Sequence, residues 1–346
     1  MADTDDGAAP RPEAYLPGRT PGGRGSLKGA ILRLMPGRLP PRAVALALKL
    51  TTKRMLRRLD EPSVLRAALE ADADQVFRAP AGAAYTPVTV GRGRGARGGL
   101  WAEIEGRLPV APPTGGRVVL YFHGGAYIAG SPGTHRHLGA ALAGAAGARV
   151  LLVDYRRAPE HPLPAALADA RAAWEWLRRE GVAPERVALA GDSAGGGLAF
   201  ALLADLTADR RPLPGAVVAF SPWTDMRGTA ASLQRNRAAD AMLPAERFDD
   251  LIGHCLGTEG ARDDWRVSPV LARYERPPPA MIFASMDEIL LDDAIAMAER
   301  LREAASDPEL ELRQGLPHAW PIFRGYLAAA DEDIARAGAF IARHLA

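Results

Sequence analysis

The stretch Val187-Ala-Leu-Ala-Gly-Asp-Ser-Ala-Gly195 carries the clearest structural signal in the chain. The apolar run Val187–Ala190 is followed by a serine between two glycines and then by a helical segment of small residues. The pattern Gly-x-Ser-x-Gly between a strand and a helix is typical of a tight turn that exposes a serine hydroxyl above a sheet. The turn also places the Ala194 amide at a helix N-terminus, where it can donate to a negatively charged oxygen. We therefore predict that Ser193 is a nucleophile.

Short apolar runs lie on both sides of this turn and alternate with helical stretches such as 163–179 and 195–209. Apolar strands that alternate with helices indicate a parallel sheet covered on both faces. The runs are Val118–Phe122, Val150–Val153, Val217–Phe220, Met281–Ala284 and Leu310–Gln314. Ahead of them, Tyr85–Val90 and Leu100–Glu105 flank a turn rich in glycine and arginine, which predicts an antiparallel hairpin. The fold class is therefore α/β, with a mostly parallel central sheet.

Changes in composition divide the chain into five parts. Residues 1–25 are rich in Gly, Pro, Arg and Asp, and we expect a disordered tail there. Residues 26–79 have helical spacing of apolar residues. Residues 80–224 form the first part of the α/β core, 225–265 interrupt its rhythm as an insertion, and 266–346 complete the core.

The overall composition excludes several classes of protein. The chain has 346 residues, of which 48% are hydrophobic and 24% charged, as in ordinary globular proteins. The single cysteine, Cys255, excludes a disulfide framework and a cysteine-rich metal site. The net charge of +2 is too small for a nucleic-acid-binding protein. We therefore expect no nucleic-acid partner.

The first 59 residues carry 12 Lys and Arg against four Asp and Glu. This basic region could touch an anionic membrane surface, although a solvated helix face explains it more simply. The longest apolar run near the start, Ala43–Leu48, is too short to span a membrane. The first residues are acidic, unlike a secretory signal. We therefore expect a cytoplasmic protein without stable membrane insertion.

A second glycine-rich loop, His123-Gly-Gly-Ala-Tyr127, directly follows a predicted strand. Consecutive glycines let backbone amides turn inward and approach a ligand closely, as an oxyanion hole requires. Taken alone, the motif could also be a plain turn. We assign His123 a structural role, in which its side chain holds the loop by hydrogen bonds.

Two further residues complete a candidate catalytic set at strand ends. Asp287 follows the strand Met281–Ala284, where a carboxylate can orient an imidazole. It is preferred to its competitors because it is nearest the strand end; these are Glu288, Asp292 and Asp293. His318 lies in Leu316-Pro-His-Ala-Trp320, after the last predicted strand. The chain order of serine, acid and histidine is that of α/β-hydrolase triads.

At this point the chain resembles a known family, the hormone-sensitive-lipase-like bacterial carboxylesterases of the α/β-hydrolase superfamily, also called family IV. The resemblance covers roughly residues 80–346 and rests on several segments in the same order. These are His123-Gly-Gly125, Asp154-Tyr-Arg-Arg-Ala-Pro-Glu-His-Pro-Leu-Pro-Ala-Ala166, Gly191-Asp-Ser-Ala-Gly-Gly196, Ser221-Pro-Trp-Thr-Asp225, Asp287-Glu-Ile-Leu-Leu-Asp292 and Pro317-His318.

The resemblance implies that the helical N-terminus and residues 225–265 form a cap over the active site. It also implies an oxyanion hole made of the amides of Gly124, Gly125 and Ala194. Many members of the family have a third glycine where this chain has Ala126. If that position requires a positive φ, the Cβ costs about 1 kcal/mol or more.

Four further residues receive supporting roles. We expect Asp154 and Arg156 to tie strand ends to the glycine-rich loop. Tyr127 and Trp223 are candidate substrate-binding residues, and core packing is an equal interpretation for Trp223.

Together these features predict a serine carboxylesterase that hydrolyses short- to medium-chain acyl esters through an acyl-enzyme. We expect no metal and no cofactor, because no ligand cluster is evident. The partner is a small-molecule ester, and the resemblance allows a homodimer.

Other functions remain open at this stage. The same triad could serve an amidase or deacetylase, a lactone hydrolase, or a hydrolase of one secondary metabolite. A membrane-peripheral lipase that uses the basic N-terminus is a further reading. A non-catalytic binding protein on the same fold is a rival from another class.

Overall fold

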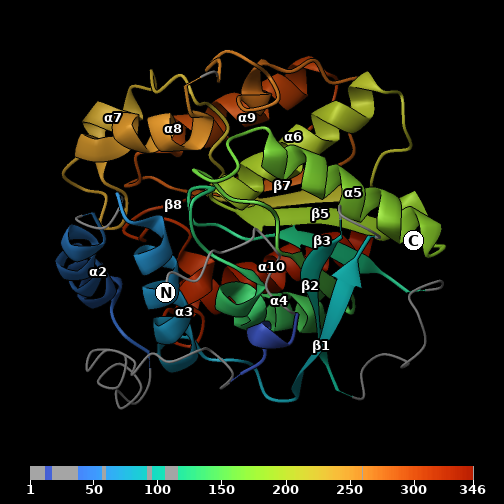
Figure 1. Cartoon of the computed structure of the whole chain (residues 1–346), viewed down its shortest axis with the longest axis horizontal. Helices are drawn as coiled ribbons and strands as arrows, with labels where there is room; N and C mark the ends of the chain where they lie inside the picture. The colour runs from blue at the N-terminus through green and yellow to red at the C-terminus, as the bar shows by residue number, and fades with distance from the viewer. Residues whose placement is uncertain are drawn as a thin grey trace, which may run out of the picture.

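The computed structural model describes residues 12–17, 38–56, 60–91, 96–105, 116–258 and 260–345. Within them, one eight-stranded sheet has the order β1-β2-β4-β3-β5-β6-β7-β8 (Figure 1). β1 pairs antiparallel with β2, β2 pairs antiparallel with β4, and the remaining pairs are parallel. The strands are β1 (Ala83–Val90), β2 (Arg97–Ile104), β3 (Val118–Phe122), β4 (Arg149–Val153), β5 (Val187–Asp192), β6 (Ala216–Phe220), β7 (Ala280–Ser285) and β8 (Glu309–Arg313).

Helices cover both faces of the sheet (Figure 1). The helices α5 (Ala165–Arg179), α6 (Ala194–Ala208) and α9 (Leu291–Glu303) pack on one face, and α4 (Pro132–Ala146) and α10 (Ala328–His344) pack on the other. Alternate residues of β3 illustrate the two cores: Leu120 and Phe122 enter the first, and Val119 and Tyr121 enter the second. Because both faces are covered, the central strands are apolar throughout.

The chain carries local signals for where individual helices begin and end. Ser131 caps α4 and exchanges hydrogen bonds with Thr134 in a capping box, and Gly147 ends the same helix in the left-handed conformation. α6 is buried on nearly all sides because its sequence is almost entirely apolar. The predicted helices 163–179 and 195–209 are found within two residues of their expected bounds, as α5 and α6.

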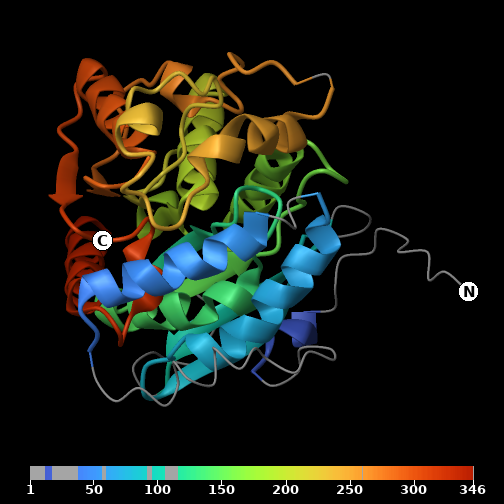
Figure 2. The same cartoon turned by 90° about the vertical axis from the view of Figure 1, so that its left-hand side faces the viewer.

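Two groups of helices lie outside these layers. The first contains α2 (Pro41–Leu56) and α3 (Pro62–Val76), and the second contains α7 (Ser232–Arg235) and α8 (Phe248–Leu256) within residues 225–265. Figure 1 shows both groups at its left-hand side, with α7 and α8 above α2 and α3, and Figure 2 shows them one above the other. They touch through Lys49 Nζ, which donates to the Ala238 carbonyl at 2.9 Å, and through the Asp60–Arg247 ion pair.

Short 3-10 helices occupy several connections. They are η1 (Pro12–Tyr15), η3 (Pro184–Arg186), η4 (Ala245–Arg247), η5 (Pro269–Leu271) and η6 (Trp320–Phe323).

The prediction of a disordered tail over residues 1–25 is wrong for residues 12–17. Tyr15 is 4% exposed, and its hydroxyl donates to Asp154 Oδ2 at 2.5 Å. Tyr15 belongs to the second core and Leu16 packs against it, so this short segment has enough apolar area to be held against the sheet. The rest of the tail, and residues 26–37, lie outside the described residues.

The strand predictions are confirmed, including the antiparallel hairpin of β1 and β2.

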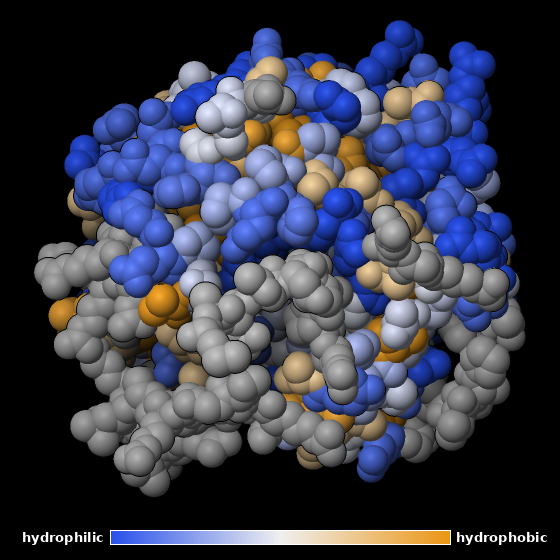
Figure 3. Space-filling view, in the orientation of Figure 1, coloured by the Kyte–Doolittle hydropathy of each residue, from blue (hydrophilic) through white to orange (hydrophobic). Residues whose placement is uncertain are grey.

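The surface seen in Figure 3 is mostly hydrophilic with scattered apolar residues. Among the helices that are described, none is long and apolar enough to cross a bilayer.

Candidate active site

Ser193 lies at the junction of β5 and α6, in a turn that glycine makes possible. Its backbone has φ 52° and ψ −123°, a conformation that is strained for a residue with a side chain. A Cβ at Gly195 would lie 2.0 Å from the Phe122 carbonyl oxygen, and one at Gly191 would lie 2.4 Å from Gly195. The close backbone contacts therefore require glycine on both sides of the serine. The serine residue is 7% exposed.

His318 lies in the loop after β8, next to the same end of the sheet. The Ala319 amide donates to Ser221 Oγ at 3.0 Å, and the Ser193 amide donates to the Phe220 carbonyl at 2.8 Å. Adjacent residues at the end of β6 thus fix both the serine turn and the histidine loop. His318 Nε2 is buried and has no hydrogen-bond partner among the described residues.

The carboxylate that meets the histidine belongs to Glu288. Its Oε2 lies 2.6 Å from His318 Nδ1, and both side chains are about 1% exposed or less. Glu288 Oε1 accepts from the Ser285 amide at 3.1 Å, so the carboxylate is itself held in place. A carboxylate at Nδ1 leaves Nε2 as the nitrogen that can accept a proton.

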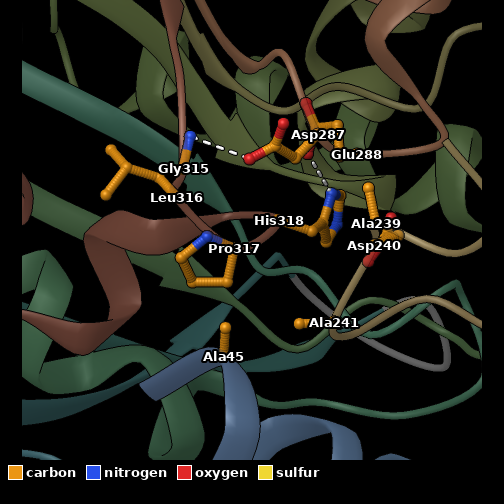
Figure 4. Close-up of a pocket in the computed structure, with 10 residues that line it drawn as sticks. All are labelled: Ala45, Ala239, Asp240, Ala241, Asp287, Glu288, Gly315, Leu316, Pro317 and His318. Carbon is orange, nitrogen blue, oxygen red and sulfur yellow. Dashed lines mark hydrogen bonds and ion pairs between the residues drawn. The ribbon is translucent and has the colours of Figure 1, made fainter. Parts of the chain in front are cut away.

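The side chain of Asp287, the acid predicted from the sequence, does not contact His318. Its Oδ2 accepts from the Gly315 amide at 2.8 Å, and its side chain is partly exposed (Figure 4). The chain turns immediately after β7, so neighbouring side chains point in different directions. Asp287 follows Met286, which is exposed to solvent. Glu288 is buried and directly precedes the buried residues Ile289–Leu291. The prediction of Asp287 as the partner of His318 is therefore wrong.

Two opposing effects set the pKa of His318. Burial lowers the pKa, but the charge of Glu288 and its hydrogen bond outweigh that effect, so the pKa is raised above its ordinary value. The imidazolium is thus stabilised by its partner, as a histidine that accepts a proton during a reaction requires.

The loop after β3 differs from the prediction at its first glycine. The Gly124 amide donates to Asp192 Oδ1 at 3.0 Å and is therefore not available to a substrate. A Cβ at Gly124 would lie 2.1 Å from Asp192 Oδ2, which explains the glycine by close approach. The prediction of Gly124 as an oxyanion-hole donor is wrong because the neighbouring carboxylate occupies its amide.

The next two amides of this loop are oriented by the carbonyls in their own peptide planes. The Gly124 carbonyl contacts His123 Nδ1 at 2.8 Å, and the Gly125 carbonyl accepts from the amides of Ile128 and Ala129 at 3.1 and 2.8 Å. Because a peptide is planar and trans, the amides of Gly125 and Ala126 point away from these carbonyls. No acceptor for either amide is found in the described part of the chain.

Ala126 does adopt the positive φ that the sequence analysis considered, at 54°, and Tyr127 follows at 59°. An alanine in this region is strained by roughly 1–2 kcal/mol. The amide of Ala194 opens α6, where it has no intrahelical acceptor. Three backbone donors are thus available near the serine turn: Gly125, Ala126 and Ala194.

His123 contacts the loop as predicted. Its ring stacks on Tyr155, with centroids 4.2 Å apart, and its Nδ1 must carry a proton because the Gly124 carbonyl can only accept. Burial lowers the pKa of His123 well below the usual value, and the nearby His135 and Arg157 lower it further. The side chain is therefore neutral and acts as a fixed donor.

Asp154 reaches the loop through its neighbour Arg157. The Arg157 guanidinium lies 3.3 Å from Asp154 Oδ1 and donates to the Gly130 carbonyl at the end of the loop. Arg156 instead pairs with Asp169 on α5. The expectation of a link to the loop thus fits Asp154, whereas the partner of Arg156 lies on a different element.

The two candidate substrate-binding residues are both buried. Tyr127 is 3% exposed and Trp223 is 1% exposed, with ring centroids 6.2 Å apart. The Trp223 amide donates to the Ser193 carbonyl at 2.9 Å, and its ring lies 5.0 Å from that of Phe248 on α8. Trp223 is therefore next to the serine turn and also part of the apolar core.

A cavity lies next to His318, and both Asp287 and Glu288 are among the residues that line it (Figure 4). It is bounded by α2, by the loop before α8 and by the loops that follow β7 and β8. Its lining consists of Ala45, Ala239, Asp240, Ala241, Asp287, Glu288, Gly315, Leu316, Pro317 and His318. Both groups of helices outside the core layers thus reach this cavity, which borders His318 and Glu288 but not Ser193.

Comparison with known proteins places this architecture in a family. The model of the α/β-hydrolase fold matches residues 119–322, more than half of the chain. An acetyl-hydrolase of Streptomyces hygroscopicus is 40% identical over 226 residues, which are 65% of this chain and 75% of that protein. The carboxylesterase/phospholipase LipF of Mycobacterium tuberculosis is 37% identical over 231 residues, which are 65% of this chain and 62% of LipF.

Solved structures agree with these relatives. The crystal structure of an esterase from the bacterial hormone-sensitive lipase family superposes with a TM-score of 0.79 and 33% identity, covering 89% of this chain and 99% of that one. A hormone-sensitive lipase from a metagenome library gives a TM-score of 0.81 and 30% identity, covering 90% of this chain and all of that one. The chain therefore belongs to the α/β-hydrolase family, in the hormone-sensitive-lipase-like group of serine ester hydrolases.

Proposed function

We propose that Ser193, His318 and Glu288 are the catalytic triad of a carboxylesterase that acts on short- to medium-chain acyl esters. The observation that carries this proposal is the buried contact of 2.6 Å between His318 Nδ1 and Glu288, which leaves His318 Nε2 without a hydrogen-bond partner among the described residues. Phe220 and Ser221, adjacent at the end of β6, hold the serine turn and the histidine loop. The amides of Gly125, Ala126 and Ala194 are the proposed oxyanion hole.

The proposed reaction has two halves. His318 Nε2 takes the proton of Ser193 Oγ as that oxygen attacks the acyl carbonyl, and Glu288 stabilises the resulting imidazolium. The three amides bind the tetrahedral oxyanion, and His318 then gives its proton to the leaving alcohol. A water molecule attacks the acyl-enzyme in the same way and releases the acid.

The size of the substrate follows from what surrounds the serine. We infer that α2 and α3, together with residues 225–265, form a cap over the site, because both groups reach the cavity beside His318. Trp223, Tyr127 and Phe248 are the proposed walls of the acyl pocket. Three large rings leave little room for a long chain, which supports acetyl to octanoyl esters. The name of the Streptomyces relative, an acetyl-hydrolase, points in the same direction.

A series of p-nitrophenyl esters from C2 to C16 tests this proposal, with Ser193→Ala as the inactive control. We expect an optimum between C2 and C8 and loss of turnover in the variant. An optimum at C12 or longer would contradict the bounded pocket. An anilide that outcompetes its matching ester would favour the amidase reading instead. Cytoplasmic location and a homodimer stay predictions.

Substitution of the two neighbouring acids tests the assignment of Glu288. Glu288→Gln should lower kcat by about 10³–10⁴-fold, as loss of the orienting acid does in such triads. Asp287→Asn keeps the size of a carboxylate that faces Gly315 and should change kcat by less than about fivefold. A larger loss in Asp287→Asn than in Glu288→Gln would overturn the assignment.

The pH profile gives a second readout of the same pair. His318 must be neutral to accept a proton, and Glu288 raises its pKa, so kcat/KM of the wild type should fall as the pH drops through that raised pKa. In Glu288→Gln the largest raising effects on the pKa of His318 are removed, and only the charges of Asp240 and Asp192 still oppose burial, so the acidic limb should move to lower pH. Asp287→Asn should leave the limb in place.

A further inference from the structure

The loop that carries two of the proposed oxyanion donors is held from outside at three successive carbonyls. The Ala126 carbonyl accepts from Cys255 Sγ on α8 at 3.1 Å. The Tyr127 carbonyl accepts from the Ala158 amide at 2.9 Å. The Ile128 carbonyl accepts from Arg66 Nε on α3 at 2.7 Å. The loop is therefore shaped by groups from three separate parts of the chain.

Among these groups, Arg66 makes the most extensive set of contacts. Besides Ile128, its Nη2 donates to the Ala158 carbonyl at 2.7 Å. Its Nη1 and Nη2 donate to the two oxygens of Glu160 at 2.8 and 2.7 Å. Since Ala158 in turn donates to the Tyr127 carbonyl, one guanidinium is connected to the loop by two routes. A planar fork with five donors can do this, whereas an ammonium group cannot reproduce the geometry.

A short chain of hydrogen bonds leads from Arg66 to the oxyanion hole. Arg66 fixes the Ile128 carbonyl, and the Ala129 amide in the same peptide plane donates to the Gly125 carbonyl at 2.8 Å. The Gly125 carbonyl shares its peptide plane with the Ala126 amide, so its direction sets the direction of that donor. Ala126 has a positive φ, a conformation that alanine does not hold without support. Arg66 supplies part of that support.

The apolar packing of α3 holds Arg66 next to the loop that contains Tyr127 and Ile128. Its neighbour Leu65 is 2% exposed and belongs to the same apolar cluster as Tyr127, Ile128 and Ala158. The hydrogen bonds of Arg66 are directed to buried backbone, while its ion-pair partner Glu160 has a side chain that is 51% exposed. An exposed ion pair contributes little to stability. The contacts with the two carbonyls are therefore the part of this arrangement that matters for the loop.

We propose that Arg66 is a positioning residue for the oxyanion hole, so that docking of α3 on the loop is required for full turnover. The inference rests on the proposed function. It also extends the active site beyond residues 119–322, the part of the chain that the family model matches. A helix that precedes the hydrolase core would thus set the geometry of its backbone donors.

Three variants separate this role from simple anchoring of a helix. Arg66→Gln removes the fork, Arg66→Lys keeps the charge with one donor group, and Glu160→Gln removes only the exposed partner. For each variant, kcat and KM are measured with p-nitrophenyl butyrate, together with the inhibition constant of a trifluoromethyl ketone. Ser193 Oγ adds to the ketone carbonyl and its proton passes to His318, so the bound hemiketal carries an oxyanion that reports on the hole.

We expect Arg66→Gln to lose about 10- to 100-fold in kcat with KM changed less than threefold, since complete loss of one donor typically costs about 10²–10³. Inhibition by the ketone should weaken in proportion to kcat/KM. Arg66→Lys should recover part of both losses, and Glu160→Gln should stay within about twofold of the wild type.

Two results would overturn the proposal. In one, Arg66→Gln lowers the melting temperature but leaves kcat and ketone inhibition unchanged. In the other, kcat falls while ketone inhibition does not. If Arg66→Gln fails to fold, Arg66→Lys decides alone, because equal kcat and ketone inhibition in Arg66→Lys and the wild type contradict the proposal. Failure of the proposed function is distinguishable, because the wild type itself would then neither turn over the ester nor bind the ketone.

Discussion

The serine turn and the loop after β3 both present groups to the same site, but they obtain their shapes in different ways. The turn at Ser193 is dictated by residues within it: Gly191 and Gly195 permit a close approach to Phe122 that no larger residue allows. The loop at Gly125–Ile128 depends instead on hydrogen bonds from Arg66, Ala158 and Cys255, which are far away in the sequence.

Because of this difference, we expect the serine turn and the loop after β3 to respond differently to substitutions. A local turn fails when its own residues are altered, and it should not respond to changes in the helices outside the core layers. A loop held from outside loses accuracy gradually as each distant support is removed. Asp192 joins the two, because it precedes Ser193 and accepts from the Gly124 amide in the loop.

The largest effect is expected from Gly195→Ala in the serine turn. The new Cβ would lie 2.0 Å from the Phe122 carbonyl oxygen, which is backbone and cannot move aside. We expect turnover to fall below detection and the free energy of unfolding to fall by about 3 kcal/mol or more. Activity and urea unfolding measure both.

Gly253→Ala on α8 is the matched control, since its Cβ meets no atom within 4 Å among the described residues. That variant should be active and up to about 1 kcal/mol more stable, because alanine favours a helix. A soluble, active Gly195→Ala protein would show that the turn is not locally determined.

An intermediate effect is expected from Asp192→Asn, which weakens the link between turn and loop. A neutral amide replaces a charged acceptor of Gly124 and Tyr121, which costs about 1 kcal/mol and roughly fivefold in kcat. KM should change little. Asp249→Asn, at an 81% exposed side chain, is the control and should be indistinguishable from the wild type.

The difference in the free energy of unfolding between the wild type and Asp192→Asn should depend on pH. Burial raises the pKa of Asp192, but His135 and Tyr121 outweigh it and hold the pKa below its ordinary value. A depressed carboxyl pKa adds stability above the unfolded pKa, and that stability is lost as the pH falls through the folded pKa. The stability gap between wild type and Asp192→Asn should therefore narrow in acid. A gap that widens in acid would contradict this account.

The smallest effect is expected from Ala126→Gly in the externally held loop. Glycine relieves the strain of φ 54° but adds flexibility to the unfolded chain, so stability should change by less than about 1 kcal/mol. If distant supports hold the loop, kcat should stay within about threefold. Ala305→Gly, at φ 60° in an exposed turn, is the control for backbone strain alone. A tenfold loss of kcat confined to Ala126→Gly would show that the loop relies on its own side chain.

The acids after β7 show where prediction from the sequence reached its limit. Distance from the strand end favoured Asp287, yet the turn directs this carboxylate to Gly315 and brings the next one to His318. The run Ile289–Leu291 was a usable signal, because a residue that begins a buried run is itself drawn inward. The choice between adjacent residues still depends on the turn, which periodicity does not encode.

The glycine-rich loop presents a similar limit. Its position and its need for inward amides could be predicted from His123-Gly-Gly. Which amides are available could not, because Gly124 is occupied by Asp192, 68 positions later in the chain. Ala126, which was set aside as a departure from the family pattern, is one of the unoccupied donors.

The sequence by itself determined the alternation of strands and helices, the serine turn and the order of the chemical groups. These features arise from short-range physics, namely apolar periodicity and the steric freedom of glycine. Only the tertiary structure decided that Glu288 meets His318, that the Gly124 amide donates to Asp192, and that Arg66 donates to the loop after β3. Each of those depends on side-chain directions and contacts between distant segments, which are fixed when the core packs.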